Sequence, residues 1–197
     1  MTDWTGNQKS TFVTLGASNH TAEERQSRDY YATDPIAAER LCDLIRLNSN
    51  IWECACGEGH LSEALLKHGY DVYSTDIIDR GYKRQNGCID FLKCSKQFNG
   101  DIVTNPPYKF AQAFVEKALK LIPTGNKVAM FLKILFLEGK KRQQLFKQGS
   151  LKYVYVSSSR ITCAKNGDFK NYNSGAVAYA WFIWEKGYKG EPIIRWF

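Results

Sequence analysis

The 197-residue sequence contains no run of about 18 apolar residues, which argues against a membrane-spanning helix. Its polar start, MTDWTGNQKSTF, lacks the apolar stretch of a secretory signal. The six cysteines form no C-x-x-C pair, so the sequence lacks the paired ligands typical of a structural zinc site, and we expect no bound metal. These absences together predict a cytoplasmic protein with reduced, mostly buried thiols.

The composition is that of one globular domain, with 44% hydrophobic, 14% aromatic and 24% charged residues. Residues 1–29 differ from the rest because they are polar and rich in Thr, Ser, Asn and Gln. We interpret them as a flexible N-terminal arm that orders on binding. Residues 30–197 then form a single domain.

The net charge of +7 is unevenly distributed along the chain. Residues 1–30 carry −1 and residues 31–82 carry −5, whereas residues 83–147 carry +9 and residues 148–197 carry +4. A basic later part favours binding of a polyanion there. Lysine-rich helices that are merely solvated are the alternative explanation.

Strand and helix patterns alternate along the domain. Helices are predicted at 35–45, with Asp34 as the capping residue, and at 60–68, 111–121 and 139–147. Strands are predicted at 50–54, 71–76, 101–104, 127–134, 151–156, 176–184 and, as a short edge, 192–196. This order predicts an α/β fold with a mainly parallel, seven-stranded sheet and helices on both faces. Ligands of such folds bind at the carboxyl ends of the strands.

The segment E-C-A-C-G-E-G at residues 53–59 connects a predicted strand to a helix, and Asp76 ends the next strand. Glycines in such a turn allow a ligand to approach the backbone, and the later acid can accept hydrogen bonds from a ribose. The third glycine of a dinucleotide fingerprint is replaced by Ser62, and Glu53 would repel a pyrophosphate. The cationic amino-acid end of S-adenosylmethionine suits Glu53 better, although the glycines could also serve only the turn.

A second motif, Asn105-Pro106-Pro107-Tyr108, follows an apolar strand. The prolines stiffen the backbone, so the Pro106 carbonyl and the Asn105 side-chain oxygen can both accept hydrogens from one planar exocyclic amine. Tyr108, assisted by Phe110, can stack on the ring that carries the amine. A strand that merely ends in a Pro-Pro turn is the structural alternative.

With these motifs in this order, residues 30–185 resemble the class I S-adenosylmethionine-dependent amino-methyltransferases. Within that class the resemblance is to the adenine-N6 DNA methyltransferases with gamma-type motif order. Small phage-encoded methyltransferases are similar in overall plan. The resemblance implies the Rossmann-like fold of that class. It also implies that Asn105, Pro106, Pro107 and Tyr108 are catalytic, and that S-adenosylmethionine is bound by Tyr31, Thr33, Glu53, Cys54, Gly57, Gly59, Asp76, Ile77, Asp90, Phe91 and Asn105.

The implied activity is methyl transfer to the N6 amine of adenine in DNA, in a host's cytoplasm if the protein is phage-encoded. Adenine in RNA, glutamine in a protein, and a non-enzymatic role in binding remain as alternatives. We expect no separate target-recognition domain, so the N-terminal arm, the basic middle region and residues 157–173 would contact the nucleic acid. His60 is predicted either to touch the cofactor or to lie on the surface, and Trp181 and Trp184 are predicted to be core residues.

Overall fold

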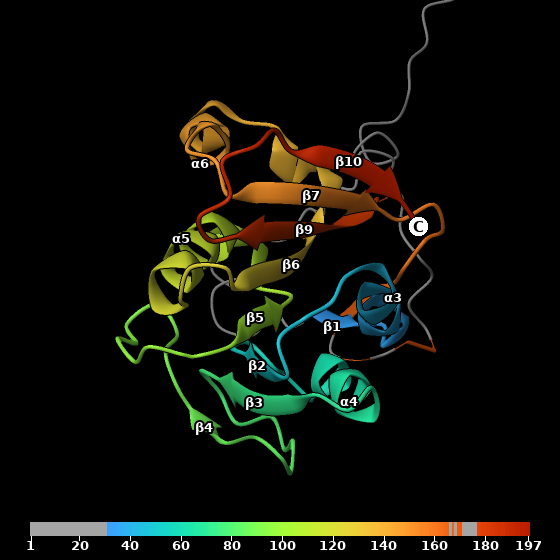
Figure 1. Cartoon of the computed structure of the whole chain (residues 1–197). Coiled ribbons are helices and arrows are strands. Elements are labelled where there is room, and N and C mark those ends of the chain that lie inside the picture. Colours follow the sequence, from blue (N-terminus) through green and yellow to red (C-terminus); the bar gives the residue numbers. More distant parts are fainter. Residues whose placement is uncertain (1–30, 166, 168, 171–176) are drawn as a thin grey trace, which may run out of the picture.

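The computed structural model describes residues 31–165, 167, 169–170 and 177–197 (Figure 1). The predicted arm, residues 1–29, lies outside the described residues. An eight-stranded sheet in the order β10-β7-β9-β6-β5-β2-β3-β4 forms the centre of the molecule. Every neighbouring pair in it is parallel except for the two pairs that contain β9. The mainly parallel α/β sheet predicted from the sequence is therefore confirmed.

All seven predicted strands are present. Their bounds are β2 Asn50–Glu53, β3 Asp71–Asp76, β5 Asp101–Thr104, β6 Lys127–Lys133, β7 Leu151–Val156, β9 Tyr179–Glu185 and β10 Ile193–Trp196. The predicted number of seven strands is one too low, because the two-residue strand β4, Gly87–Cys88, extends the sheet beyond β3. Asn86 fastens this strand: its side chain accepts a hydrogen bond from Ser74 N–H at 2.8 Å, and its own N–H donates to Ser74 O at 2.7 Å.

A separate two-stranded sheet joins the beginning of the described chain to a segment between β7 and β9. Strand β1, Tyr31–Thr33, pairs antiparallel with β8, Cys163–Lys165, so that Thr33 lies opposite Cys163. Next to this pairing, the Asp34 N–H donates to Thr162 O at 3.0 Å. The small sheet thereby brings residues about 130 positions apart into register.

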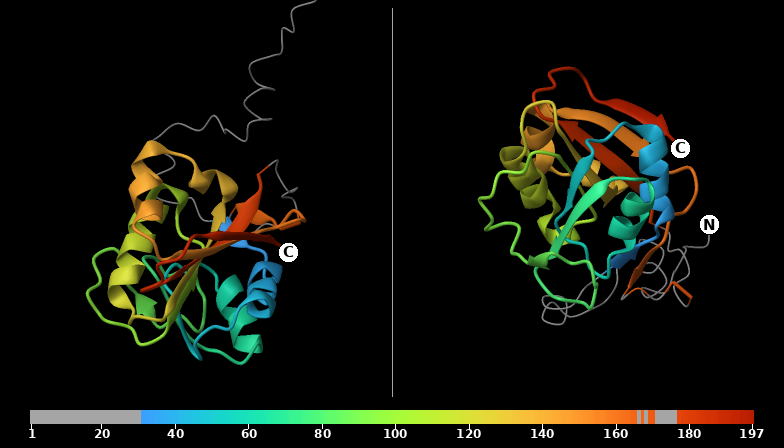
Figure 2. Two further views of the ribbon diagram at one scale, coloured as in Figure 1. Left: turned by 45° about the horizontal axis from the view of Figure 1, so that its top comes forward. Right: turned by 60° about the horizontal axis from the view of Figure 1, so that its bottom comes forward.

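Helices cover both faces of the large sheet (Figure 2). One face carries α3 Ile36–Leu44 and α4 His60–Lys67, and the other carries α5 Ala111–Leu121 and α6 Gln143–Lys147. Three short 3-10 helices follow strand ends or precede α6: η1 Tyr108–Phe110, η2 Ile134–Leu137 and η3 Lys140–Arg142. No helix in the described part of the chain is long and apolar enough to cross a membrane.

The start of the first helix agrees with the prediction: the Asp34 carboxylate accepts a hydrogen bond from the Ile36 N–H at 3.0 Å, and Pro35 has helical φ and ψ angles of −50° and −30° just before α3. The helix predicted over 139–147 differs from the one observed, because it is divided into η3 and α6. Gly139 has a φ of 120°, which lies outside the helical region, so the helical structure begins after it, at Lys140.

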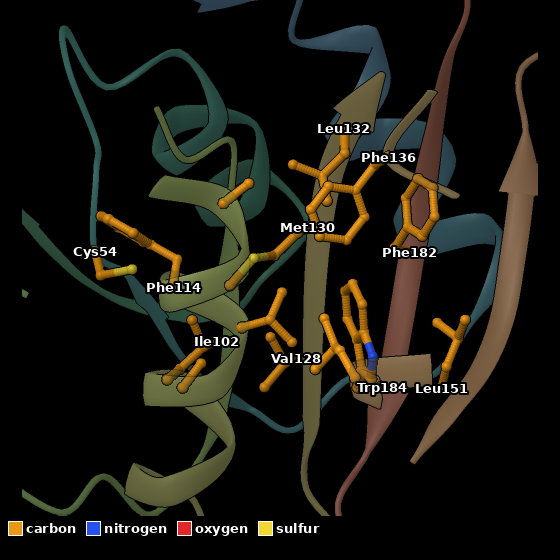
Figure 3. Packing of buried hydrophobic residues seen from close by; sticks show 14 of the residues in the cluster. Cys54, Ile102, Phe114, Val128, Met130, Leu132, Phe136, Leu151, Phe182 and Trp184 are labelled. Carbon is orange, nitrogen blue, oxygen red and sulfur yellow. The ribbon is translucent and has the colours of Figure 1, made fainter. Parts of the chain in front are cut away.

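The core is divided by the sheet into two apolar layers. Side chains alternate along β6, where Val128, Met130 and Leu132 face α5 and the residues between them face α3 and α4. Figure 3 shows these three residues beside Phe114 of α5 and Trp184 of β9. Trp181 and Trp184 are both completely buried, which confirms the prediction that they are core residues.

Candidate functional site

The two sequence motifs lie at one edge of the sheet, because parallel strands place their carboxyl ends together. Trp52 of β2 pairs with both Tyr73 of β3 and Ile102 of β5, so the segments that follow these strands emerge side by side. The glycine loop follows β2, Asp76 ends β3, and Asn105 follows β5. This is the edge at which open α/β sheets bind ligands.

The glycine loop adopts a backbone that only glycine tolerates easily at two positions. Gly57 and Gly59 have φ values of 56° and 84°, both in the left-handed region. A Cβ on Gly59 would also overlap the ring of Tyr82. The loop is tied to β3 because the Gly57 N–H donates to the Asp76 carboxylate at 2.9 Å. The prediction that these glycines form a tight turn is thus confirmed.

Asp76 is 8% exposed and holds two backbone amides, one on each oxygen. Besides Gly57, it accepts a hydrogen bond from the Ile78 N–H at 3.1 Å. A carboxylate oxygen has a second lone pair, so each oxygen of Asp76 can accept a further hydrogen bond from a hydroxyl. The neighbouring Ile77 side chain is 63% exposed, which leaves an apolar surface beside this acid.

Glu53 is a buried acid beside the glycine loop. It is 2% exposed, and the Ser62 hydroxyl donates a hydrogen bond to its carboxyl group. The Ser62 hydroxyl oxygen also lies 2.6 Å from the Ser74 hydroxyl oxygen, within hydrogen-bond distance. Burial raises the pKa of Glu53 to about 8, the Ser62 hydrogen bond opposes this rise, and the charge of Asp76 adds to it. Among the described residues, no ion pair involves Glu53.

Asp90 and Phe91, predicted together as cofactor contacts, have different surroundings. The Asp90 carboxylate accepts a hydrogen bond from the Leu92 N–H at 3.1 Å and pairs with Lys93 at 3.3 Å. Phe91 is 2% exposed, and its ring centroid lies 5.2 Å from that of Trp52 and 5.0 Å from that of Phe114. The structure therefore places Phe91 in the core, as it does Cys54, which is also 2% exposed, and a cofactor contact of either remains a prediction.

The Asn105 side chain is held by strand β1. Its amide nitrogen donates to the Thr33 hydroxyl at 2.7 Å and to the Tyr31 carbonyl at 3.4 Å. Both bonds use the amide hydrogens, so the amide oxygen remains to accept a hydrogen bond from another group. That oxygen is buried and has no hydrogen-bond partner among the described residues. The structure thus brings the predicted Tyr31 and Thr33 to the Asn-Pro-Pro-Tyr motif.

Tyr108 lies in a cluster of aromatic and polar side chains. Its hydroxyl donates to the Tyr179 hydroxyl at 3.0 Å, and its ring centroid is 5.9 Å from that of Tyr31. The Lys133 ammonium lies 4.5 Å from the centroid of the same ring. Burial raises the pKa of Tyr108 well above its usual value, so the phenol stays protonated at neutral pH. Nearby, burial also raises the pKa of the Cys163 thiol, to about 11.

Three members of this cluster were missed from the sequence: Lys133, Cys163 and Tyr179. Lys133 and Tyr179 lie opposite each other where β6 pairs with β9, and Cys163 lies opposite Thr33. The only local signal was a charged residue near the end of the apolar strand 127–134. The neighbours of this charged residue, Lys133, depend on the antiparallel pairing of β6 with β9, which the sequence pattern does not specify.

The segment after β8 reaches the glycine loop. The ring centroids of His60 and Phe169 lie 5.3 Å apart, with the rings edge to face. Gly167 lies so close to Glu58 that a Cβ on it would overlap the Glu58 carboxylate. His60 is therefore packed against another aromatic ring at the start of α4. The segment 157–173, predicted to contact the nucleic acid, is described only in part, because residues 166, 168 and 171–173 lie outside the described residues.

The cysteines and acids of the described chain form no further site. All six cysteines are free, and the described residues contain no group of three or more metal-ligating side chains. The candidate site therefore consists of the glycine loop with Glu53 and Asp76, and of the Asn-Pro-Pro-Tyr motif with its surrounding cluster.

The sequence matches no family model, and a search of curated proteins gives no match. Solved structures do resemble the fold. The type IIG restriction endonuclease BpuSI aligns with a TM-score of 0.60 and 14% identity, over 92% of this chain and 28% of its own. A Listeria monocytogenes protein assigned to the class I S-adenosylmethionine-dependent methyltransferases aligns with a TM-score of 0.54 and 15% identity, over 95% of this chain and 70% of its own.

TrmN from Thermus thermophilus aligns with a TM-score of 0.52 and 20% identity, over 77% of this chain and 48% of its own. The chain thus spans about half the length of TrmN. At these identities the likenesses show the fold alone. They establish a Rossmann-like class I methyltransferase fold, as the sequence resemblance predicted.

Proposed function

We propose that the protein transfers a methyl group from S-adenosylmethionine to the N6 amine of adenine in DNA. One observation carries this proposal: the buried, unpartnered amide oxygen of Asn105 lies in the same cluster as the Tyr108 ring. A buried acceptor without a donor is costly, by about 1–3 kcal/mol. An amine hydrogen of a substrate would remove that cost.

The glycine loop and its two acids fit the proposed cofactor. Glu53 is a buried carboxyl group that forms no ion pair within the described part of the chain, and the ammonium group of S-adenosylmethionine would provide a cation. Asp76 can accept hydrogen bonds from the ribose hydroxyls, and the exposed Ile77 side chain offers an apolar contact to the adenine ring. When bound, the cofactor supplies an electrophilic methyl group.

The Asn-Pro-Pro-Tyr motif then acts on the acceptor. The Asn105 amide oxygen and the Pro106 carbonyl would each accept one hydrogen of the target amine. These two bonds draw the nitrogen lone pair out of conjugation and direct it toward the methyl group. Tyr108 would stack on the adenine ring and hold it in place. No strong base is needed, because the nitrogen loses its proton after methylation.

The choice of DNA rests on charge and on the resemblance. The chain is basic from residue 83 onward, which favours a polyanion over a protein acceptor. One of the structural neighbours is a restriction endonuclease. RNA adenine and protein glutamine are the other acceptors of this chemistry, and they are separated by experiment.

The test is to incubate the protein with labelled S-adenosylmethionine and DNA, RNA or protein, and to identify the methylated product. We expect N6-methyladenine in DNA. Label in protein and none in DNA would refute the proposal, and label in RNA alone would shift it to RNA.

Substitution tests the catalytic assignment. Asn105→Ala should abolish transfer while leaving S-adenosylmethionine binding nearly unchanged. Asn99→Ala is the matched control, because Asn99 is an exposed loop residue just before β5, and it should keep full activity. Equal activity of both variants, with equal thermal stability, would overturn the role of Asn105.

A further inference from the structure

We propose that residues 135–142 form a binding surface for single-stranded nucleic acid, beside the catalytic cluster. The inference rests on the proposed function, since it names the form of its substrate. The segment begins two residues after Lys133, whose ammonium lies over the Tyr108 ring. Ile134, between them, donates its N–H to Ala178 O at 2.9 Å, next to Tyr179. The segment is thereby joined to the catalytic cluster by the backbone.

The segment is fixed in shape by one arginine. The Arg142 guanidinium donates to the Phe136 carbonyl at 2.8 Å, to the Leu135 carbonyl at 3.3 Å, and to the Glu138 carbonyl. It also lies 4.9 Å from the centroid of the Phe136 ring. The Phe136 side chain is buried in the core and anchors the segment to it. Arg142 therefore holds the loop through its Nε and Nη2 atoms.

The fixed loop presents two kinds of side chain to solvent. Leu135 and Leu137 are 62% and 40% exposed, although they flank the buried Phe136. Lys140 and Lys141 are also exposed, and no ion pair involves either of them among the residues that the structure describes. Glu138 is the acidic residue of the segment, which leaves a net charge of +2 over 135–142.

Apolar and cationic groups on one rigid loop match an unpaired strand better than a duplex. The lysines can bind phosphates of either form. Exposed apolar side chains can reach base faces only where the bases are unstacked, as in a single strand. Tyr108 needs the same condition, because an adenine must leave the helix before the motif can reach its amine, at a cost of a few kcal/mol in a duplex.

The test is fluorescence anisotropy with labelled oligonucleotides, single-stranded and double-stranded, of one sequence. Wild type should bind the single strand more tightly. The double variant Lys140→Gln/Lys141→Gln loses two phosphate contacts, so its salt slope should fall by about 1.4, with about 25-fold weaker binding at 0.1 M salt. Leu135→Ser should weaken binding to the single strand without changing the salt slope.

The control removes the same charge elsewhere. Arg46→Gln/Lys67→Gln changes two exposed basic residues, one shortly after α3 and one at the end of α4, and should leave binding unchanged. Equal losses in both double variants, equal binding of duplex and single strand, or no binding at all would each overturn the inference. Failure of the proposed function shows differently, as wild type that binds the oligonucleotide but transfers no methyl group to it.

Discussion

Replacing Glu53 by glutamine should make the protein less sensitive to alkaline pH. Glu53 is 2% exposed, and burial raises the pKa of its carboxyl group from 4.5 to about 8. The folded protein therefore retains a proton that the unfolded chain has already released. Where the folded state binds more protons, the free energy of unfolding falls as the pH rises. The loss begins near pH 4.5 and is complete slightly above pH 8.

The size of the effect follows from the shift. A pKa change of 3.5 units at about 1.4 kcal/mol per unit gives a total on the order of 5 kcal/mol. Between pH 6 and pH 8, the same relation gives a loss of about 2 kcal/mol. The glutamine side chain in Glu53→Gln cannot ionise, and its amide oxygen can still accept the Ser62 hydrogen bond. The variant should therefore lack the part of the pH-dependent loss of unfolding free energy that comes from Glu53.

The measurement is urea unfolding followed by tryptophan fluorescence, at pH 6 and pH 8, for wild type and Glu53→Gln. The loss between the two pH values should be smaller in the variant by about 2 kcal/mol. Burial also raises the pKa of Asp101, but Asp101 is present in both proteins and cancels from the difference. Identical pH dependence of the two proteins would refute the argument that Glu53 is buried as a neutral acid.

Three further predictions concern the same edge of the sheet. Glu53, with a pKa of about 8, is mostly protonated at pH 7, so binding of S-adenosylmethionine should release about 0.9 proton from it. Calorimetry in buffers of different ionisation enthalpy measures this release, and a binding heat that is independent of the buffer would contradict it. Tyr179→Phe removes the acceptor that orients Tyr108, so kcat should fall about 5-fold with cofactor affinity unchanged, and a change confined to KM would argue against that role. Gly59→Ala forces a side chain into the left-handed region and onto Tyr82, so unfolding should become easier by about 2 kcal/mol or more in a denaturant titration, and wild-type stability would be inconsistent with the loop geometry.

The strands and the order of the motifs could be predicted from the sequence because their signals are local. The run 127–134 is apolar enough to identify a strand buried on both faces, and β6 occupies Lys127–Lys133. The glycine loop and the Asn-Pro-Pro-Tyr motif follow strands directly, so their positions in the fold follow from the strand assignments. Asp76 ends β3 as predicted.

Features that depend on distant contacts could not be predicted. Strand β4 has only two residues and exists because Asn86 binds Ser74, while β8 is defined by its partner β1. Phe91 directly follows an acid in the sequence, yet its ring occupies the space between Trp52 and Phe114. Such outcomes are decided by packing across the sheet rather than by residue order.

The small β1–β8 sheet makes the orientation of the Asn105 amide depend on a long-range contact. The partners of Asn105 lie 72 and 74 positions earlier in the chain, in three-residue β1, which pairs with equally short β8. Opening this small sheet would expose Ala32, Thr33, Cys163 and Ala164, each at most 3% exposed, so it should not open separately from the core. Heating should then abolish activity and unfold the protein together, and the amide hydrogens of Tyr31–Thr33 should exchange only on unfolding.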